Sequence, residues 1–454
     1  MRIYIDCTHT YHSELNTGIQ RVVRNIVNHS KNVGKSLGVD CIPIIQSPDG
    51  YVRITDLNYN LKKRFLFRVR WRLNDYYSRI IRHLTKRLSS PRIVRFLKAG
   101  KHEFGLTWLI LLFMSPVKWL WRFQNRVTLS NATIDDPHPL PQNGDILLMP
   151  DKFWDYDFYN LLAKAKRDGA IIIPIIHDLF PISHPEFYVN KTHFEISFRK
   201  LYLCADGFLC NSDNTQKSLV DYLQTQPCYQ DWQSKRFDYF HLGAELDTVE
   251  TNGRIRDAIK TIFANDAQVY LAVGTIEPRK NHVYLLNVLN ILLQKGSHAT
   301  LVVVGRIGWL CDEIVVSIRS HPMFGSRLFF FDDASDSELE FCYSHAKALL
   351  CPSINEGFGL PVIEAQMKGL PVFASDITVF REVAGASAAY FDNTDPHSLA
   401  DMLLEYEESS LFPAEGPHGF TWLTWADSTA QMLTKLIQMT DEIKSDKAKD
   451  TSIT

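Results

Sequence analysis

Residues 351–376 (CPSINEGFGLPVIEAQMKGLPVFASD) constrain the fold of this chain more than any other stretch. The apolar residues 348–351 before them predict a buried strand, and Pro361 suits the first position of a following helix, where no backbone N–H is needed. Gly357 and Gly359 lie in the intervening loop. Free backbone N–H groups and the helix dipole favour an anion at the start of such a helix. The stretch therefore predicts an α/β fold with a phosphate site at a strand-to-helix turn.

Two carboxylates flank this predicted phosphate site. Glu356 precedes the glycines, and Glu364 falls in the first turns of the helix. Carboxylates would repel a diphosphate, so sugar hydroxyl groups are better hydrogen-bonding partners for them. The combination predicts a nucleotide-sugar site. The alternative is an ordinary turn in which the glycines only relieve backbone strain.

The chain length and the order of its patterns predict two domains. A chain of 454 residues is too long for one hydrophobic core, and apolar β-branched runs alternate with helical patterns. Such alternation predicts parallel sheets with helices on both faces. The eight cysteines form no CxxC pair, and the N-terminus lacks the apolar core of a signal peptide, so we expect a cytoplasmic protein with reduced cysteines.

A second glycine-led helix is predicted near the N-terminus. Gly18 precedes apolar residues at helical spacing, so its backbone N–H could also face a phosphate. A simple helix start is the alternative. Arg21 and Arg24 fall on the polar face of this helix, where exposure to solvent is expected.

Three further side chains are candidates for the site. His177 follows the apolar run 171–176, at the end of a predicted parallel strand where ligands bind in α/β sheets. Arg279 and Lys280 follow another predicted strand and would neutralise a diphosphate. The alternatives are a hydrogen-bonded structural histidine and two solvated cations.

Residues 61–126 differ from the rest of the chain in charge, because they contain seventeen Lys and Arg residues and only two acidic residues. Their net charge of +15 leaves about −17 on the rest of the chain, since the total is −2. A basic amphipathic helix is predicted there, followed by the apolar run 106–121, which is shorter than the roughly 20 residues that span a bilayer. We expect this segment to bind an anionic membrane surface. Packing on its own domain or on a partner subunit is the alternative, and the aliphatic composition disfavours nucleic acid.

The strings CPSINEGFGLPVIEA, GTIEPRKN, IHDLFPISHPEF and TGIQRVVRNI resemble retaining glycosyltransferase family 4, in its bacterial O-antigen and surface-polysaccharide mannosyltransferase-like branch. The resemblance implies the GT-B fold, with two Rossmann-like domains and an interdomain cleft, here with a basic helical insertion at about 57–140. The implied domains are an acceptor-side domain (1–245), a nucleotide-sugar domain (246–424), a helix crossing back (425–440) and a disordered tail (441–454).

The resemblance also implies roles for individual residues. Glu356 and His177 would contact the transferred sugar, Glu364 the ribose, and Arg306 the region near the base. The diphosphate would meet Gly18, Arg279, Lys280, Gly357, Phe358, Gly359 and Leu360. Neither a metal ion nor a cofactor is expected, because protein cations and amides supply the countercharge; the Asp155–Asp157 DxD string is interpreted as a chance match.

The expected reaction is transfer of mannose from GDP-mannose to a lipid-linked glycan at the cytoplasmic face of the inner membrane, where partner transferases are candidate neighbours. A UDP- or dTDP-sugar donor, or a soluble phosphorylase or synthase on the same fold, is the alternative. An inactive membrane-bound scaffold is disfavoured, because burying several charged groups without a ligand is costly.

Overall fold

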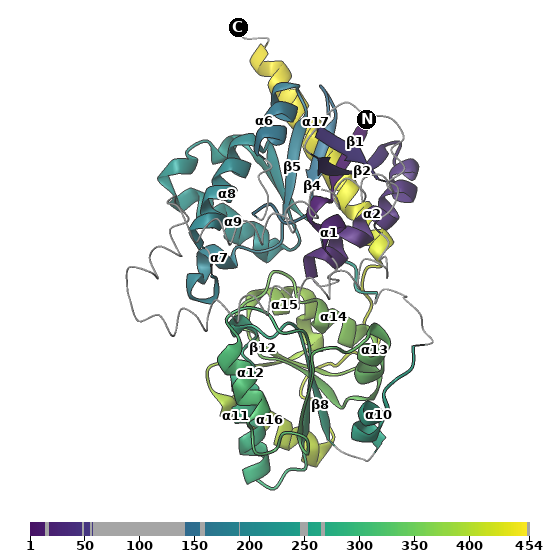
Figure 1. The fold of residues 1–454 in the computed structure, drawn as a ribbon, viewed down its shortest axis with the longest axis vertical. Helices are drawn as coiled ribbons and strands as arrows, with labels where there is room; N and C mark the ends of the chain where they lie inside the picture. Colours follow the sequence, from purple (N-terminus) through teal and green to yellow (C-terminus); the bar gives the residue numbers. More distant parts are fainter. Residues whose placement is uncertain are drawn as a thin grey trace, which may run out of the picture.

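The computed structural model describes residues 1–13, 18–47, 50–54, 57, 141–154, 159–189, 191–245, 253–264 and 268–451. Within these ranges the chain forms two Rossmann-like α/β domains, one above the other in Figure 1. The predicted α/β class is confirmed. The basic segment 61–126 and the DxD string at 155–157 lie outside the described residues.

The first domain is built on a seven-stranded sheet of order β3-β2-β1-β4-β5-β6-β7, which is parallel except where β3 pairs antiparallel with β2. All six residues of β5 are buried, because helices cover both faces of the sheet. The strands are β1 (Arg2–Asp6), β2 (Asp40–Ser47), β3 (Gly50–Arg53), β4 (Ile146–Met149), β5 (Ile171–Ile176), β6 (Gly207–Cys210) and β7 (Arg236–Tyr239). The helices are α1 (Thr8–His12), α2 (Gly18–Ser36), α6 (Tyr159–Arg167), α7 (Phe180–Ser183), α8 (Lys191–Cys204) and α9 (Asp213–Thr225).

The second domain is built on a six-stranded, wholly parallel sheet of order β10-β9-β8-β11-β12-β13. Its strands are β8 (Val269–Val273), β9 (Thr300–Val304), β10 (Leu328–Phe331), β11 (Ala348–Cys351), β12 (Val372–Ser375) and β13 (Ala389–Phe391). Its helices are α10 (Asp257–Ala264), α11 (His282–Gln294), α12 (Asp312–Arg319), α13 (Asp336–His345), α14 (Leu360–Met367), α15 (Thr378–Ala384) and α16 (Pro396–Ser409).

The strand order reverses once in each sheet, between β1 and β4 in the first and between β8 and β11 in the second. In open α/β sheets ligands bind beyond the carboxyl ends of the strands at such a reversal. The fold therefore points to two regions, the loops after β1 and β4 and the loops after β8 and β11.

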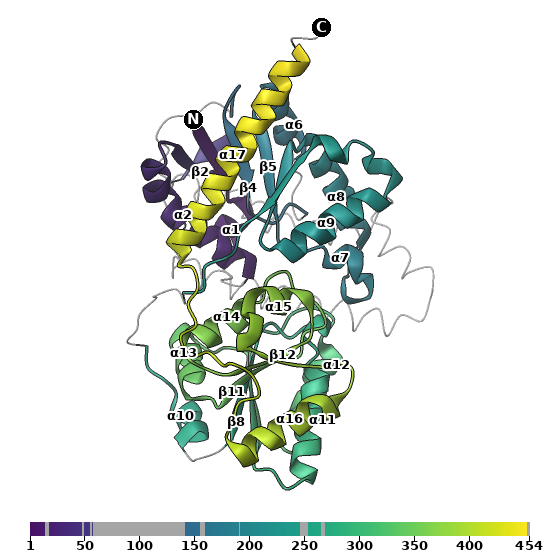
Figure 2. The same cartoon turned by 180° about the vertical axis from the view of Figure 1, so that it is seen from behind.

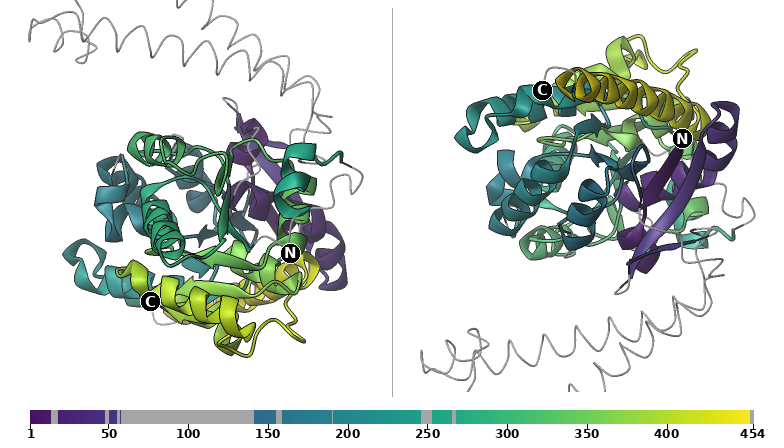
Figure 3. Two further views of the ribbon diagram at one scale, coloured as in Figure 1. Left: turned by 90° about the horizontal axis from the view of Figure 1, so that it is seen from below. Right: turned by 90° about the horizontal axis from the view of Figure 1, so that it is seen from above.

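The last helix, α17 (Trp425–Thr451), packs against α2 and β7 of the first domain, although it follows the second domain in the sequence. Figures 2 and 3 show it running along the outside of the first domain. Buried Leu433 and Leu436 share an apolar cluster with Val22 and Ile26 of α2. Burial of this apolar stripe joins the two ends of the chain.

The expected disorder of residues 441–454 is wrong for the part that the structure describes, because α17 continues to Thr451. Ile443 is buried in the shared cluster, and Lys447 Nζ donates to Asp206 Oδ1 at 2.8 Å. Asp446 forms an ion pair with Arg236. The polar sequence of this stretch is thus matched by charges on the first domain.

Among the described helices, none is long and apolar enough to cross a membrane.

Seven of the eight cysteines are buried and one, Cys228, is exposed.

The docked end of α17 leads to a stability prediction. Ile443→Ala should lower the free energy of unfolding by about 2–4 kcal/mol, because it removes buried methyl groups and leaves a cavity. Urea unfolding followed by circular dichroism measures this change. Exposed Ser445→Ala, two residues away, is the control and should change the free energy by less than about 0.5 kcal/mol. Equal stability of the Ile443→Ala and wild-type proteins would show that this end of the helix is not docked.

Candidate active site

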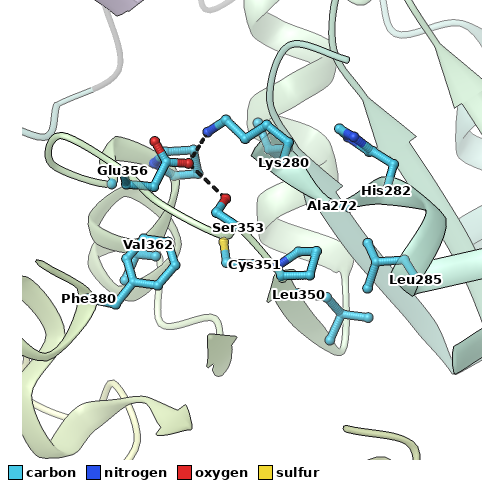
Figure 4. A pocket seen from close by; sticks show the side chains of 14 residues that line it. Ala272, Lys280, His282, Leu285, Leu350, Cys351, Ser353, Glu356, Val362 and Phe380 are labelled. Atoms are coloured by element: carbon cyan, nitrogen blue, oxygen red, sulfur yellow. Dashed lines mark hydrogen bonds and ion pairs between the residues drawn. The ribbon is translucent and has the colours of Figure 1, made fainter. Parts of the chain in front are cut away.

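A carboxylate held by two cations lies where the strand order of the second sheet reverses. Glu356, in the loop after β11, accepts hydrogen bonds from Lys280 Nζ, from Arg279 Nη1 at 2.6 Å and from Ser353 Oγ at 2.8 Å. Figure 4 shows its carboxylate between Lys280 and Ser353. The two cations come from the turn between β8 and α11. The loops after the two central strands thus form one charged cluster.

The ionisation of Glu356 follows from these contacts. Its burial alone would raise the pKa, but the adjacent Arg279 and Lys280 charges and the hydrogen bonds lower it to about 2. Glu356 is therefore a carboxylate throughout the physiological pH range.

Arg279 holds several groups together. Its Nη1 also donates to the carbonyl oxygen of Asn355 at 3.2 Å, and its Nη2 lies 2.6 Å from Glu277 Oε1. On the other side its guanidinium carbon lies 4.6 Å from the centre of the Phe180 ring in α7 of the first domain. Burial lowers the pKa of Arg279, but the negative charges of Glu356 and Glu277 raise it by more, so Arg279 stays charged. Arg279 thus connects two loops of the second domain to the first domain.

Two more carboxyl groups surround this guanidinium. Glu277 is almost fully buried, and neither of its carboxylate oxygens accepts a hydrogen bond from any residue that the structure describes, so its contact with Arg279 is purely an ion pair. Burial raises the pKa of Glu277 and of Asp178 against the opposing effect of Arg279. The cluster contains more acidic than basic groups, and Glu356 is the carboxylate that accepts hydrogen bonds from both cations.

The glycines of the loop permit close approach of the backbone. A Cβ on Gly357 would lie 2.0 Å from the carbonyl oxygen of His177 in the first domain. Gly359 caps α14 with φ +102°, a conformation that other residues rarely adopt, and a Cβ there would also collide with Phe380. In the first turn of α14 Pro361 has no N–H, and the N–H of Val362 donates to the carbonyl oxygen of Gly359 at 3.0 Å, so Leu360 is the first residue of the helix whose N–H could meet a ligand. The structure thus has the helix start that the sequence predicts, at Leu360, four residues after Glu356.

His177 lies at the carboxyl end of β5, on the first-domain side of the same boundary. Its Nε2 lies 2.7 Å from the carbonyl oxygen of Pro150. Burial lowers its pKa, so the imidazole is neutral at neutral pH, with the Nε2 proton donated to that carbonyl. The remaining ring nitrogen, Nδ1, is then a hydrogen-bond acceptor.

Glu364 forms a second contact between the domains. Its Oε1 pairs with Arg21 Nη1 of α2, and its Oε2 accepts a hydrogen bond from Tyr343 Oη at 2.8 Å. The expected exposure of Arg21 is wrong, because its side chain is only 12% exposed. Helical periodicity alone could not reveal a partner from another domain. Gly18 is itself exposed and lies one turn before Arg21.

The remaining predicted residues are placed as follows. The Phe358 ring is buried near His241 and Trp422, with ring centres 6.0 Å apart in both cases, so this residue has only its backbone to offer a ligand. Arg306 is exposed, in a loop that packs on the β8–α11 turn through the N–H of Ile276. Among the described residues, no hydrogen bond or ion pair joins the Arg306 side chain to the Glu356 cluster.

A small cavity of about 10 Å³ adjoins the cluster and has room for about one water molecule. Lys280, His282, Ser353 and Glu356 provide its polar lining, with apolar residues of β8, β11 and α14 around them. A nucleotide-sugar would need the two loops to move apart. Among the described residues no group of His, Cys, Asp and Glu side chains is arranged to hold a metal ion.

Several residues at this site were not singled out in the sequence. Phe180, Glu277 and Tyr343 become relevant only through contacts with residues far along the chain. Phe180 and Glu277 nevertheless stand within three residues of His177 and Arg279, inside the strings IHDLFPISHPEF and GTIEPRKN. Tyr343 has no comparable signal in the sequence.

Part of the chain is similar to proteins named as glycosyltransferases. Residues 254–415 match the family described as glycosyl transferases group 1. The chain is 32% identical over 370 residues to the serotype-specific mannosyltransferase WbdA of Escherichia coli, covering 77% of this chain and 44% of WbdA. It is 26% identical over 236 residues to the O-antigen chain mannosyltransferase RfbU of Salmonella typhimurium, covering 51% of this chain and 60% of RfbU. The chain thus spans less than half the length of WbdA.

Two solved structures are similar over nearly the whole chain. The crystal structure of Anabaena HepE in complex with UDP and glucose has a TM-score of 0.51 at 12% identity, covering 99% of this chain and 100% of that chain. Sucrose-phosphate synthase from Thermosynechococcus elongatus has a TM-score of 0.52 at 14% identity, with both chains fully covered. At such identities the likeness concerns the fold. We conclude that this chain has the GT-B fold and that its residues 254–415 form a glycosyl transferases group 1 domain.

Proposed function

We propose that this protein is a retaining glycosyltransferase that moves mannose from GDP-mannose to a lipid-linked glycan during synthesis of a bacterial surface polysaccharide. One observation carries the proposal: Glu356, held by Lys280 and Arg279, lies in the loop that leads from β11 to α14, at the reversal point of the second sheet. WbdA is named as a serotype-specific mannosyltransferase and RfbU as an O-antigen chain mannosyltransferase, which supports the choice of mannose and of a surface polysaccharide.

The donor would bind across the boundary between the domains. Its diphosphate would meet the backbone N–H groups of Gly359 and Leu360 and the Lys280 ammonium, which together offset its charge. Glu364 would accept hydrogen bonds from ribose hydroxyls with the lone pairs that Arg21 and Tyr343 leave available. His177, whose backbone packs on Gly357, would contact the sugar.

Transfer of the sugar develops negative charge on the leaving diphosphate and positive charge on the sugar, and the site must stabilise both. As the bond from the anomeric carbon to the diphosphate breaks, negative charge grows on the leaving oxygen and Lys280 opposes it. Positive charge grows at the anomeric carbon, and the Glu356 carboxylate, ionised at neutral pH, opposes that. The anomeric configuration is retained if the acceptor hydroxyl attacks the anomeric carbon from the same face that the diphosphate leaves. The hydroxyl then passes its proton to the leaving phosphate oxygen.

The acceptor would bind to the first domain. A second small cavity lies where the strand order of that sheet reverses, and its polar lining includes Asp6, Thr8, Gln46 and Asp151. Carboxylates and hydroxyls of this kind suit the hydroxyl groups of a glycan. The basic segment 61–126 would bring the protein to the anionic membrane that carries a lipid-linked acceptor.

Donor identity can be tested by protection from thermal unfolding. A nucleotide-sugar at one hundred times its Kd should stabilise the protein by about 2.7 kcal/mol, because it binds only the folded state. GDP-mannose should raise Tm more than UDP-glucose or a dTDP-sugar at equal concentration. A larger shift with UDP- or dTDP-sugars would contradict the choice of donor, and no shift with any of them would contradict the enzyme proposal.

Removal of the Lys280 charge should stop turnover. Lys280→Ala should lower kcat by about 10²- to 10³-fold, because one stabilising contact to the leaving group is lost. Lys295→Ala, an exposed lysine at the end of α11, is the control and should keep wild-type activity. Sugar release from the donor measures both, with circular dichroism as a check of folding. Normal turnover by Lys280→Ala would remove this lysine from the mechanism.

The membrane proposal predicts electrostatic binding by the unmodified protein. Sedimentation with vesicles containing anionic phospholipid should exceed sedimentation with neutral vesicles, and it should fall steeply as salt is raised from 0.05 to about 0.5 M. Replacing residues 61–126 with a short Gly-Ser linker should abolish the difference. Equal binding to neutral and anionic vesicles would refute an electrostatic role for this segment.

A further inference from the structure

The backbone that follows Glu356 is held by side chains of the first domain. The carbonyl oxygen of Gly357 accepts hydrogen bonds from Ser212 Oγ at 2.8 Å and from Thr215 Oγ1 at 3.1 Å. Both hydroxyl groups stand at the start of α9, where Ser212 is the N-cap, and all three residues are buried. Because a peptide unit is planar, fixing this carbonyl also fixes the direction of the Phe358 N–H. The first domain thus sets the orientation of one peptide group in the loop that carries Glu356.

The absence of a side chain at Gly357 serves the contact between the domains. Gly357 is not one of the glycines with a positive φ, so its backbone conformation is open to other residues. A Cβ there would nevertheless lie 2.0 Å from the carbonyl oxygen of His177 and 3.3 Å from Asp178 Cβ, both in the first domain. The requirement for glycine therefore comes from the neighbouring domain and not from the loop itself.

The residue before Glu356 also meets the first domain. Asn355 Nδ2 lies 3.4 Å from Nδ1 of His184, and Asn355 Oδ1 accepts a hydrogen bond from the Glu356 N–H at 2.8 Å. The carboxylate itself is held within the second domain by two cations and a serine hydroxyl. Glu356 is thus a second-domain side chain whose backbone is flanked on both sides by contacts with the first domain.

Helix α9 is in turn fixed against the second domain. The carboxylate of Glu382 in α15 accepts hydrogen bonds from the N–H groups of Asp213 and Asn214 at 2.8 and 2.9 Å. Its Oε1 also lies 2.8 Å from Nε2 of His241. These contacts hold in place the first turn of α9, which bears the two hydroxyl groups.

We infer that Ser212 and Thr215 are positioning residues for the proposed reaction. Their hydroxyl groups fix the peptide group after Glu356 and thereby the carboxylate that opposes the developing positive charge, whereas Gly357 allows the first domain to reach this peptide. The inference rests on the proposed function, because that function supplies the reaction. It makes the catalytic geometry of a second-domain loop depend on a helix of the first domain.

Removal of one hydroxyl group tests the positioning role. Thr215→Val should lower kcat about fivefold, the effect of one lost hydrogen bond, and should change the Kd for the donor selected by the thermal screen by less than about twofold. Thr215→Ser keeps a hydroxyl group and should recover most of the wild-type kcat. Thr225→Val, the same change at the exposed far end of α9, is the control and should keep both values. A lower Tm with unchanged kcat below the unfolding temperature would mean a structural role only and would overturn the inference.

A double-mutant cycle shows whether the hydroxyl group acts through Glu356. If it does, Thr215→Val should slow the Glu356→Gln variant by less than about twofold under single-turnover conditions, because the carboxylate being positioned is already gone. A further loss of about fivefold in that background would contradict action through this carboxylate.

Gly357→Ala provides an independent variant, since the nearest atoms to the added methyl group belong to the first domain. Its kcat should fall at least about tenfold while circular dichroism shows wild-type secondary structure. If the wild-type protein turns over none of the GDP-, UDP- and dTDP-sugars, the proposed function fails and the inference with it. Wild-type turnover that neither Thr215→Val nor Gly357→Ala reduces would refute the inference alone.

Discussion

The interaction on which the rest of this site depends is the buried contact of one guanidinium with two carboxylates and an aromatic ring. Arg279 pairs with Glu356 and Glu277 and stacks on Phe180, which lies in the other domain. Loss of this cation would leave the buried Glu277 carboxyl group without its ion-pair partner and Glu356 with Lys280 alone, a cost on the order of 3–5 kcal/mol. Because its donors are taken by these neighbours, Arg279 orients Glu356 and leaves the ammonium of Lys280 as the group better placed for a diphosphate.

The boundary between the domains is held by backbone contacts as well as by charges. The carbonyl oxygen of Gly357 accepts hydrogen bonds from Ser212 at 2.8 Å and from Thr215 at 3.1 Å, both at the start of α9. Glu382 of α15 accepts from the N–H groups of Asp213 and Asn214 at 2.8 and 2.9 Å, so a carboxylate from one domain caps a helix of the other. These hydrogen bonds hold the boundary closed, so a nucleotide-sugar that binds between the domains has to separate them.

Much of the fold could be predicted from local patterns. The apolar runs at β5 and β9 are buried along their whole length, as expected for parallel strands covered on both faces, and the Pro361 pattern matches a helix that begins at Leu360. The same reasoning failed for the end of α17, because a polar composition resembles disorder when its partners are distant. Asp446 and Lys447 find theirs at Arg236 and Asp206.

The sequence by itself determined which chemical groups stand at the ends of which strands. The reason is that the spacing of apolar residues in strands and helices, and the backbone preferences of Gly359 and Pro361, are local properties of the chain. It also placed Glu356 and Lys280 after strands of a common sheet. Only the tertiary structure decided that these two side chains touch, that Arg279 faces inward and that Arg21 meets Glu364. Those outcomes depend on strand order and on the fit of one domain against the other, which bring together groups that lie from 76 to 343 residues apart.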